Sequence, residues 1–227
     1  MSPRPGGEAD KAGNRYEYLW TIDRLLDVMQ GKANHICIEP IGVEGAGVEF
    51  WIEYPNHREY HQAKRSAGVG RKWTLSRLNQ ENVLSTFKTK VEEPNAECVF
   101  ASGSTADEFQ MLCERALGVT SAIELGADAE KSSFAALRSY WNNCPEPEAL
   151  GALRRIRVEH WPEENLHRHV YTRIAPLVNG DEETACHILR GLIEDRVDKE
   201  KMLTAQQIWD YLSKHGIGRS EWWRDKD

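Results

Sequence analysis

The stretch from residue 36 to residue 66 decides the fold, and it reads ICIEPIGVEGAGVEFWIEYPNHREYHQAKRS. Within it, apolar residues occupy every second position over residues 48–54, which is typical of a half-buried β-strand. Residues 55–57 have turn composition, and residues 59–65 resemble a returning strand. The pattern therefore predicts two strands joined by a tight turn.

If these strands pair as a hairpin, the position of the turn sets which side chains lie opposite each other. A turn centred within residues 55–56 places Glu49 opposite Gln62. A shift of one residue in that centre places Glu49 opposite Lys64 instead. Because Gln62 and Lys64 are two residues apart, they share one face of their strand. We therefore expect a carboxylate, an amide and an ammonium group on one patch.

Such a patch suits the hydrolysis of a phosphodiester bond. Mg²⁺ takes oxygen ligands, and one or two protein carboxylates together with a substrate phosphate are enough to hold it. The metal polarises the phosphoryl group and activates a water molecule, while a nearby lysine orients that water and neutralises developing charge. The same spacing is common by chance, so an exposed hairpin with a surface ion pair is the alternative.

Several segments together carry a resemblance to a known family. They are Glu39, Val48-Glu49-Phe50, Tyr60-His61-Gln62-Ala63-Lys64-Arg65, the opening Gly6-Gly7 with Gly13-Asn14-Arg15-Tyr16-Glu17-Tyr18, and Glu97-Cys98-Val99-Phe100-Ala101-Ser102. With these segments the chain resembles the PD-(D/E)XK nuclease superfamily. Within that superfamily it is similar to the double-stranded DNA endonuclease domains of bacterial anti-phage systems. Such domains occur in CBASS effectors and at the N-terminus of AVAST-type STAND NTPases.

The resemblance implies roles for three residues. Glu49 takes the position of the metal-binding aspartate, Gln62 that of the second acidic ligand, and Lys64 that of the catalytic lysine. The implied metal is Mg²⁺, or Mn²⁺ in its place, with Glu49 and Gln62 as ligands. The chain departs from the family pattern at both ligands. Glu49 is one methylene longer than aspartate, and the neutral Gln62 leaves the site one negative charge short.

The function implied by the resemblance is that of a Mg²⁺-dependent endonuclease. Such a hydrolase would cut double-stranded DNA as an antiviral defence effector. The resemblance also implies a homo-oligomer in the active state and fusion to a STAND NTPase or another sensor module. Two alternatives stay open. One is a catalytically inactive, nuclease-like module for oligomerisation or DNA binding, and the other is a ribonuclease built on the same site.

Auxiliary and DNA-binding candidates follow from position and charge. In the family that the chain resembles, an acid on the first helix can reach the metal site, which makes Glu17 an auxiliary candidate. Glu39, near the end of a strand, is a second one. Residues 58–77 hold six basic residues against one acid, so we expect DNA phosphates there, although a solvated loop explains the same charge. The DNA-binding candidates are Arg65, Arg71, Lys72 and Arg77.

Composition narrows the class of protein. The formal net charge of −7 counts against a protein that coats nucleic acid in general. The five cysteines are odd in number and lack C-x-x-C spacing, which indicates buried free thiols in a reducing cytoplasm. No apolar run approaches the length of a membrane span, and the eight histidines form no metal-binding motif.

Periodicity predicts an α/β fold. In agreement with the superfamily, we expect a restriction-endonuclease-like mixed central sheet flanked by helices, with a C-terminal helical extension. The expected strands are residues 35–41, 48–54, 59–65, 97–102 and 156–158. The expected helices are residues 15–29, 74–93, 134–141 and a segment that starts with a capping box at 105–108 and ends at Gly118.

Four segments are expected along the chain. They are a flexible lead-in over residues 1–14, a PD-(D/E)XK-like core over 15–147, a mainly helical extension over 148–220 and a tail over 221–227. The tail holds Trp222 and Trp223, large aromatic residues that need an apolar contact. We therefore expect the tail to lie just before a sensor or NTPase module of a longer protein. The alternative is that both rings pack back on the helical part.

Overall fold

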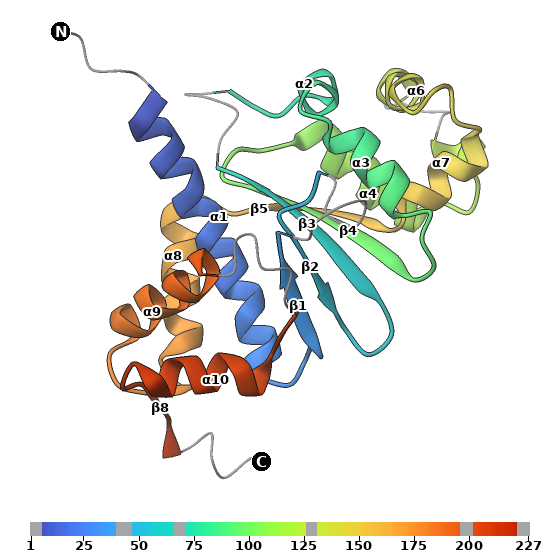
Figure 1. Ribbon diagram of the computed structural model, residues 1–227. Coiled ribbons are helices and arrows are strands. Elements are labelled where there is room, and N and C mark those ends of the chain that lie inside the picture. Colours follow the sequence, from blue (N-terminus) through green and yellow to red (C-terminus); the bar gives the residue numbers. More distant parts are fainter. Residues whose placement is uncertain (1–5, 40–46, 66–70, 126–130, 196–201, 222–227) are drawn as a thin grey trace, which may run out of the picture. The chain divides into compact units, whose positions relative to one another are not determined.

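The computed structural model describes residues 6–39, 47–65, 71–125, 131–195 and 202–221, with side chains from Arg15 onward. The chain divides into two compact units, each assembled from separate stretches of sequence. The first unit takes Met1–Gly45, Glu49–Pro55 and Pro162–Asp227, and the second takes Ala46–Val48 and Asn56–Trp161. Figure 1 labels most of the helices and strands of both units.

The first unit combines a group of helices with a small antiparallel sheet. Its helices, which pack against one another in Figure 1, are α1 (Gly6–Met29), α8 (Glu163–Ile174), α9 (Glu182–Glu194) and α10 (Ala205–Lys214). Its sheet has the order β2 (Phe50–Glu53), β1 (His35–Ile38) and β7 (Met202–Thr204), with both pairs antiparallel. A separate two-stranded ladder joins β6 (Val178–Asn179) to β8 (Gly218–Arg219).

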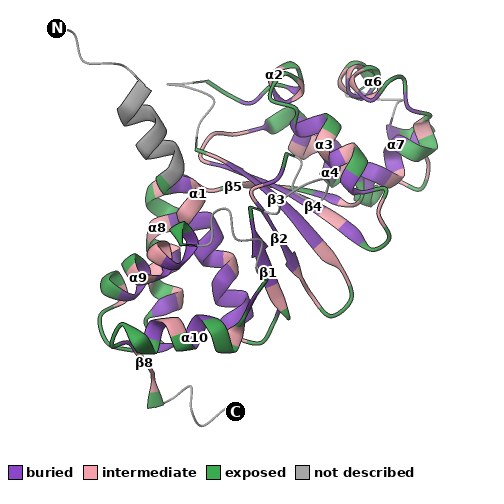
Figure 2. Cartoon of the chain, in the orientation of Figure 1, coloured by how far each residue is buried: buried purple, intermediate pink, exposed green. Residues whose placement is uncertain are grey.

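Helix α1 is buried on most of its circumference, as Figure 2 shows. The apolar residues Ile22, Leu25 and Leu26 are inside, and so are Tyr16 and Trp20, which are both 0% exposed. Two acids, Asp23 and Asp27, are buried with them. A helix that is buried on most sides is typical of the centre of a protein unit. The other helices of the first unit therefore pack around α1.

The sequence predicted the C-terminal end of α1 but not its start. The helix begins at Gly6, in the segment expected to be a lead-in, because residues 8–12 are mainly good helix formers. It ends at Met29, and Gly31 follows with φ at +69°, a conformation that glycine adopts without strain. The C-terminal end is therefore confirmed, and the predicted start at Arg15 is wrong.

The second unit is a parallel sheet with helices packed on it. Its strand order is β3 (Arg58–Lys64), β4 (Ala96–Ser102) and β5 (Ile156–His160). Its helices are α2 (Leu75–Gln80), α3 (Val83–Lys90), α4 (Asp107–Gly118), α5 (Ala122–Leu125), α6 (Lys131–Tyr140) and α7 (Glu146–Leu153). Helix α3 contacts β4 and α4 contacts β5. Phe87, Phe100 and Phe109 are 0% exposed between these layers.

The described elements confirm a mixed α/β protein with sheet strands flanked by helices and a helical C-terminal part. All five predicted strands are present, with ends that differ by a few residues. The finer expectation, a sheet of the restriction-endonuclease type, stays a prediction.

Two predictions in the second unit are wrong. The helix expected over residues 74–93 is two helices, α2 and α3, because Asn82 takes the left-handed conformation with φ at +60°. Thr74 nevertheless caps α2 as expected, with its Oγ1 accepting a bond from the N–H of Arg77. The capping box at residues 105–108 does not form, since the N-cap of α4 is Ala106, which has no side chain to accept a bond.

The strand expected over residues 48–54 is shorter and more buried than predicted. Strand β2 covers Phe50–Glu53, and Phe50, Trp51 and Ile52 are each at most 4% exposed. Side chains on both faces of β2 are thus buried, which the alternation of apolar residues did not indicate.

The remaining predictions concern cysteines, membranes and the tail. All five cysteines are buried free thiols, as predicted. Among the residues described, no helix combines the length and the hydrophobicity needed to cross a bilayer. Trp222 and Trp223 lie outside the described residues.

Candidate functional site

The residues expected to form a metal site are distributed over both units. Gln62 and Lys64 lie on β3 of the second unit, while Glu49 directly precedes β2 of the first. Glu39 follows β1, and its N–H donates to the carbonyl of Glu49 at 2.8 Å. The structure therefore joins two of the acidic candidates through their backbones. The register of Glu49 against Gln62 or Lys64 stays a prediction.

Gln62 has one satisfied and one unsatisfied side-chain atom. It is 5% exposed, and its Nε2 donates to the carbonyl of Gly47. Its Oε1 is buried and has no hydrogen-bond partner in the described part of the chain. A buried oxygen without a partner is unfavourable, and a hard cation would satisfy it. The oxygen therefore fits Mg²⁺ or Mn²⁺, and metal binding at Gln62 with Glu49 stays a prediction.

The basic candidates take different positions in the second unit. Arg65 and Arg71 are exposed. Lys72 is also exposed, but its Nζ donates to Asp107 at 2.5 Å. The guanidinium of Arg77 lies 4.9 Å from the centre of the Trp73 ring. These contacts hold Lys72 and Arg77 against the protein itself.

The auxiliary candidate Glu17 lies half-buried on α1 in the first unit. Its backbone carbonyl accepts a bond from the hydroxyl of Thr21 at 2.9 Å.

A cluster in the second unit was not predicted from the sequence. Single atoms of His57, Glu59 and Glu97 lie within 4.8 Å of one another, so these residues could hold a metal ion. However, Arg157 already contacts both carboxylates, at 2.9 Å from Glu59 and 3.4 Å from Glu97. Burial disfavours ionisation of Glu59, but His61 and Arg157 hold its carboxyl pKa well below the ordinary value. Because Arg157 supplies the positive charge, we interpret the cluster as a structural ion network.

A pocket of about 300 Å³ lies in the first unit among α1, α8 and α9. Aromatic rings, cations and apolar side chains line it, namely Arg15, Tyr18, Leu19, Ile22, His167, Tyr171, Glu183, Cys186, His187 and Arg190. The guanidinium of Arg190 lies 4.8 Å from the centre of the Tyr18 ring, a cation–π contact. The rings of His167 and Tyr171, which are one turn apart on α8, have centres 4.2 Å apart. The pocket thus places flat aromatic surfaces beside positive charge.

The lining of this pocket offers guanidinium donors to an anionic ligand. Two guanidinium groups, those of Arg15 and Arg190, face one acid of the lining, Glu183. Arg15 is 56% exposed and contacts Glu163 at 3.4 Å, while Arg190 is 43% exposed and contacts Glu194 at 2.9 Å. Each of these ion pairs is made through Nε, and a guanidinium has five N–H donors. Further donors are therefore left for a ligand.

The hydroxyl and thiol groups of the pocket are protonated at pH 7. Burial raises the pKa of the Tyr18 and Tyr171 hydroxyls above the ordinary value. Burial also raises the pKa of the Cys186 thiol to about 11. Protonated hydroxyls donate hydrogen bonds, so they add no negative charge that would repel an anion.

No residue of this pocket was a site candidate in the sequence. Tyr18 lies on α1, far along the chain from Tyr171 on α8 and Arg190 on α9, and the approach of the three side chains depends on helix packing. The one local signal was the four-residue spacing of His167 and Tyr171, which places both on one face of α8.

Comparisons with known proteins were made for both sequence and structure. No family model matches the sequence, and no curated protein matches it. The structure is similar to that of the Acinetobacter baumannii Cap4 SAVED/CARF-domain containing receptor with the cyclic trinucleotide 3′3′3′-cAAA. The TM-score is 0.55 at 10% identity, and the match covers 94% of this chain and 45% of the receptor. It is also similar to the Moraxella osloensis Cap4 SAVED/CARF-domain containing receptor, with a TM-score of 0.53 at 9% identity.

These matches show a shared fold. The Moraxella match covers 88% of this chain and 46% of that receptor, so this chain spans less than half the length of both receptors. At about 10% identity, the roles of individual residues are not carried over from one protein to the other.

The structural comparison overturns the sequence-based recognition. The similar structures are named as receptors, two of them with bound cyclic trinucleotides, and not as PD-(D/E)XK nucleases. The predictions of a Mg²⁺-dependent endonuclease, of hydrolase activity and of double-stranded DNA as the partner are therefore wrong. Without double-stranded DNA as a partner, nothing supports the predicted DNA-binding role of Arg65, Arg71, Lys72 and Arg77. The neutral amide of Gln62 had already departed from the acidic pattern of that family.

Proposed function

We propose that the chain is a non-catalytic, ligand-sensing module of a cytoplasmic anti-phage receptor and that it binds a cyclic oligonucleotide. The observation that carries the proposal is the structural similarity over 94% of this chain to Cap4 receptors. Two of these hold 3′3′3′-cAAA and 2′3′3′-cAAA. The proposal develops the non-catalytic alternative that the sequence left open.

The pocket of the first unit supports this proposal through its chemistry. A cyclic oligonucleotide presents bases, which stack on aromatic rings, and phosphodiester groups, which carry one negative charge each. Tyr18 and Tyr171 supply ring surfaces, and Arg190 supplies charge-assisted hydrogen bonds. Pockets for small ligands have volumes of about 300–1,000 Å³, so this one suits a single nucleotide of the ring.

Calorimetric titration of the protein with cyclic oligonucleotides tests the proposal. The probes are 3′3′3′-cAAA, 2′3′3′-cAAA and a panel of cyclic dinucleotides and trinucleotides with other bases. We expect saturable binding that weakens with salt, because phosphate contacts release counterions. Arg190→Ala and Tyr18→Ala should each weaken binding about tenfold or more. Arg168→Ala, an exposed substitution on α8 outside the pocket, should leave binding unchanged.

Two negative results have different meanings. Absence of binding across the whole panel would contradict the proposed function. Binding that both pocket variants leave unchanged would support the function but contradict the assignment of this pocket.

A further inference from the structure

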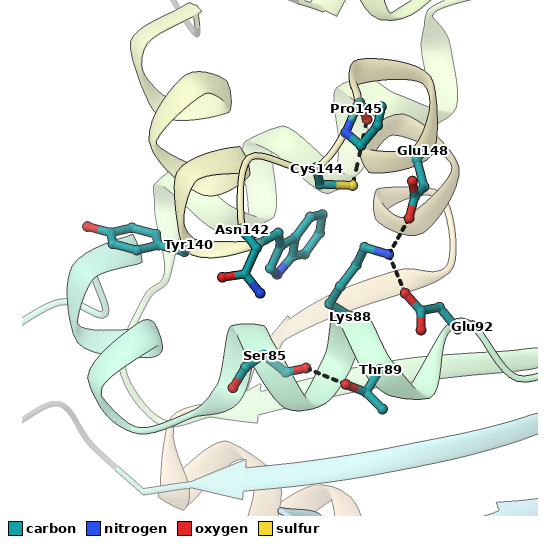
Figure 3. A pocket seen from close by; sticks show the side chains of 10 residues that line it. Ser85, Lys88, Thr89, Glu92, Tyr140, Asn142, Cys144, Pro145 and Glu148 are labelled. Atoms are coloured by element: carbon teal, nitrogen blue, oxygen red, sulfur yellow. Dashed lines mark hydrogen bonds and ion pairs between the residues drawn. The ribbon is translucent and has the colours of Figure 1, made fainter.

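A second pocket, of about 360 Å³, lies within the second unit. Residues of α3, of the turn at residues 140–145 and of α7 line it (Figure 3). At its centre the Nζ of Lys88 donates to Glu92 Oε1 at 2.6 Å and to Glu148 Oε1 at 2.8 Å. One cation against two carboxylates leaves this group with one net negative charge.

The three charged side chains have unused hydrogen-bonding capacity. An ammonium group carries three donors, and the two carboxylates take two of those of Lys88. The side chain of Lys88 is 13% exposed, and its third donor is left for a ligand. Glu92 and Glu148 are 60% and 54% exposed. The Cys144 thiol also hydrogen-bonds to the Glu148 carboxylate, and both carboxylates keep acceptor lone pairs beside these bonds. The pocket therefore presents one donor directly beside two strong acceptors.

The wall opposite the charged groups is held in a fixed conformation. Trp141 is 5% exposed, and its indole N–H donates to the carbonyl of Leu84 at 2.8 Å. Arg138 closes the same turn by donating to the carbonyl of Cys144 at 2.8 Å and to Glu146 at 2.6 Å. A wall held in this way loses little conformational freedom when a ligand binds.

We propose that this pocket binds a guanine base. The Watson–Crick edge of guanine places the O6 acceptor beside the N1–H and N2–H₂ donors. This order is complementary to the pocket, where the Lys88 ammonium donor lies beside the Glu148 carboxylate acceptor. O6 accepts the third N–H of Lys88, N1–H and N2–H₂ donate to the Glu148 carboxylate, and the base packs against Trp141. Adenine would place an amino group against the ammonium and a lone pair against the carboxylate, so the pocket rejects it.

This inference is independent of the cyclic oligonucleotide site. The two pockets lie in different units and have different charge, and the guanine pocket requires no phosphate contact. Failure of one proposal therefore leaves the other unaffected.

Titration of the full chain with guanosine, inosine and adenosine monophosphates, followed by calorimetry or ligand-observed NMR, tests the inference. We expect guanosine monophosphate to bind at least tenfold more tightly than adenosine monophosphate, since each bidentate base contact contributes about 1–3 kcal/mol of discrimination. The inosine compound, which lacks the N2 amino group, should bind with intermediate affinity. Glu148→Gln, which keeps the size of the side chain, should weaken guanosine monophosphate binding about tenfold.

The matched control is Glu114→Gln, an exposed acid on α4 outside the pocket, which should bind like the wild type. Equal affinity for the guanosine and adenosine compounds would overturn the inference. Wild-type affinity in Glu148→Gln would overturn it as well. Lys88→Met is a second variant, and it should bind guanosine monophosphate more weakly while circular dichroism confirms its fold.

Discussion

Arg173 on α8 and Asp23 on α1 form a 2.6 Å ion pair between residues that are 150 positions apart in the sequence. Asp23 is 1% exposed, and Arg24 and His169 contact the same carboxylate. A second nitrogen of Arg173 reaches Asp27 at 2.7 Å. The packing of α8 on α1 therefore includes buried charge as well as apolar contacts.

We predict that Arg173→Met destabilises the first unit. Removing one partner of a buried ion pair leaves the other charge uncompensated, which costs about 3–5 kcal/mol. Because Arg24 and His169 remain near Asp23, we expect the free energy of unfolding to fall by about 3 kcal/mol in urea titrations. Arg168→Met, at an exposed position of the same helix, is the control and should change stability by less than about 0.5 kcal/mol. Equal stability of both variants would contradict the role of the ion pair.

We predict that acid destabilises the protein through Asp23 and Glu59. Burial opposes ionisation of Asp23, yet His169, Arg24 and Arg173 hold its pKa below the ordinary 3.8. Glu59 likewise has a pKa below its ordinary 4.5, owing to His61 and Arg157. Both carboxyl groups bind protons more readily in the unfolded chain. Their contribution to stability is therefore complete at neutral pH and is lost as the pH falls below about 4.5.

Urea midpoints measured from pH 7 to pH 3 check this prediction. The midpoint should fall most steeply below pH 4.5, and Asp23→Asn should reduce the steepness. A midpoint that is constant over this range would refute the assigned pKa directions.

Local signals in the sequence predicted much of the fold. Thr204 and Gln207 form a capping box at the start of α10, and Thr74 caps α2, both from local sequence motifs. The break between α2 and α3 was not predicted, because the apolar pattern of Leu84 and Phe87 suits a continuous helix. Asn82 interrupts that helix, and asparagine tolerates the left-handed conformation better than most residues.

We predict that Gly47→Ala destabilises the second unit. Gly47 has φ at +76°, and a Cβ there would collide with the side chain of Thr86. The left-handed conformation alone costs a residue with a Cβ about 1–2 kcal/mol. Gly118→Ala is the control, because no atom lies within 4 Å of a Cβ at that position. Thermal unfolding should show a lower midpoint for Gly47→Ala only.

A double variant separates the two causes. Thr86→Ala combined with Gly47→Ala removes the collision and leaves the backbone strain, so it should recover part of the lost stability. Full recovery would show that backbone conformation contributes nothing at this position.

We predict that Mg²⁺ stabilises the folded protein through Gln62. A ligand that binds only the folded state raises the unfolding midpoint. Gln62→Leu removes the oxygen and should abolish the increase, whereas Gln62→Glu restores the missing negative charge and should enlarge it. Gln80→Leu, at an exposed position at the end of α2, is the control. Equal responses of all four proteins to Mg²⁺ would exclude Gln62 as a ligand.

The candidate sites were harder to predict than the fold for a physical reason. The aromatic and basic pocket needs Tyr18, Tyr171 and Arg190 from three helices, and the guanine pocket needs Lys88 and Glu148 from two. No sequence spacing relates residues that only tertiary packing brings together. Gln62 and Lys64 could be grouped from the sequence because residues two positions apart on one strand share a face.

The division of the chain has a consequence for its synthesis. The second unit is nearly continuous, so all of its strands and helices have been translated once Trp161 has left the ribosome. The first unit needs both ends of the sequence, and α1 cannot bury its sides before α8, α9 and α10 are made. We therefore expect the apolar side chains of α1 to stay exposed during most of the translation of the chain. We also expect chaperones to bind α1 during this time.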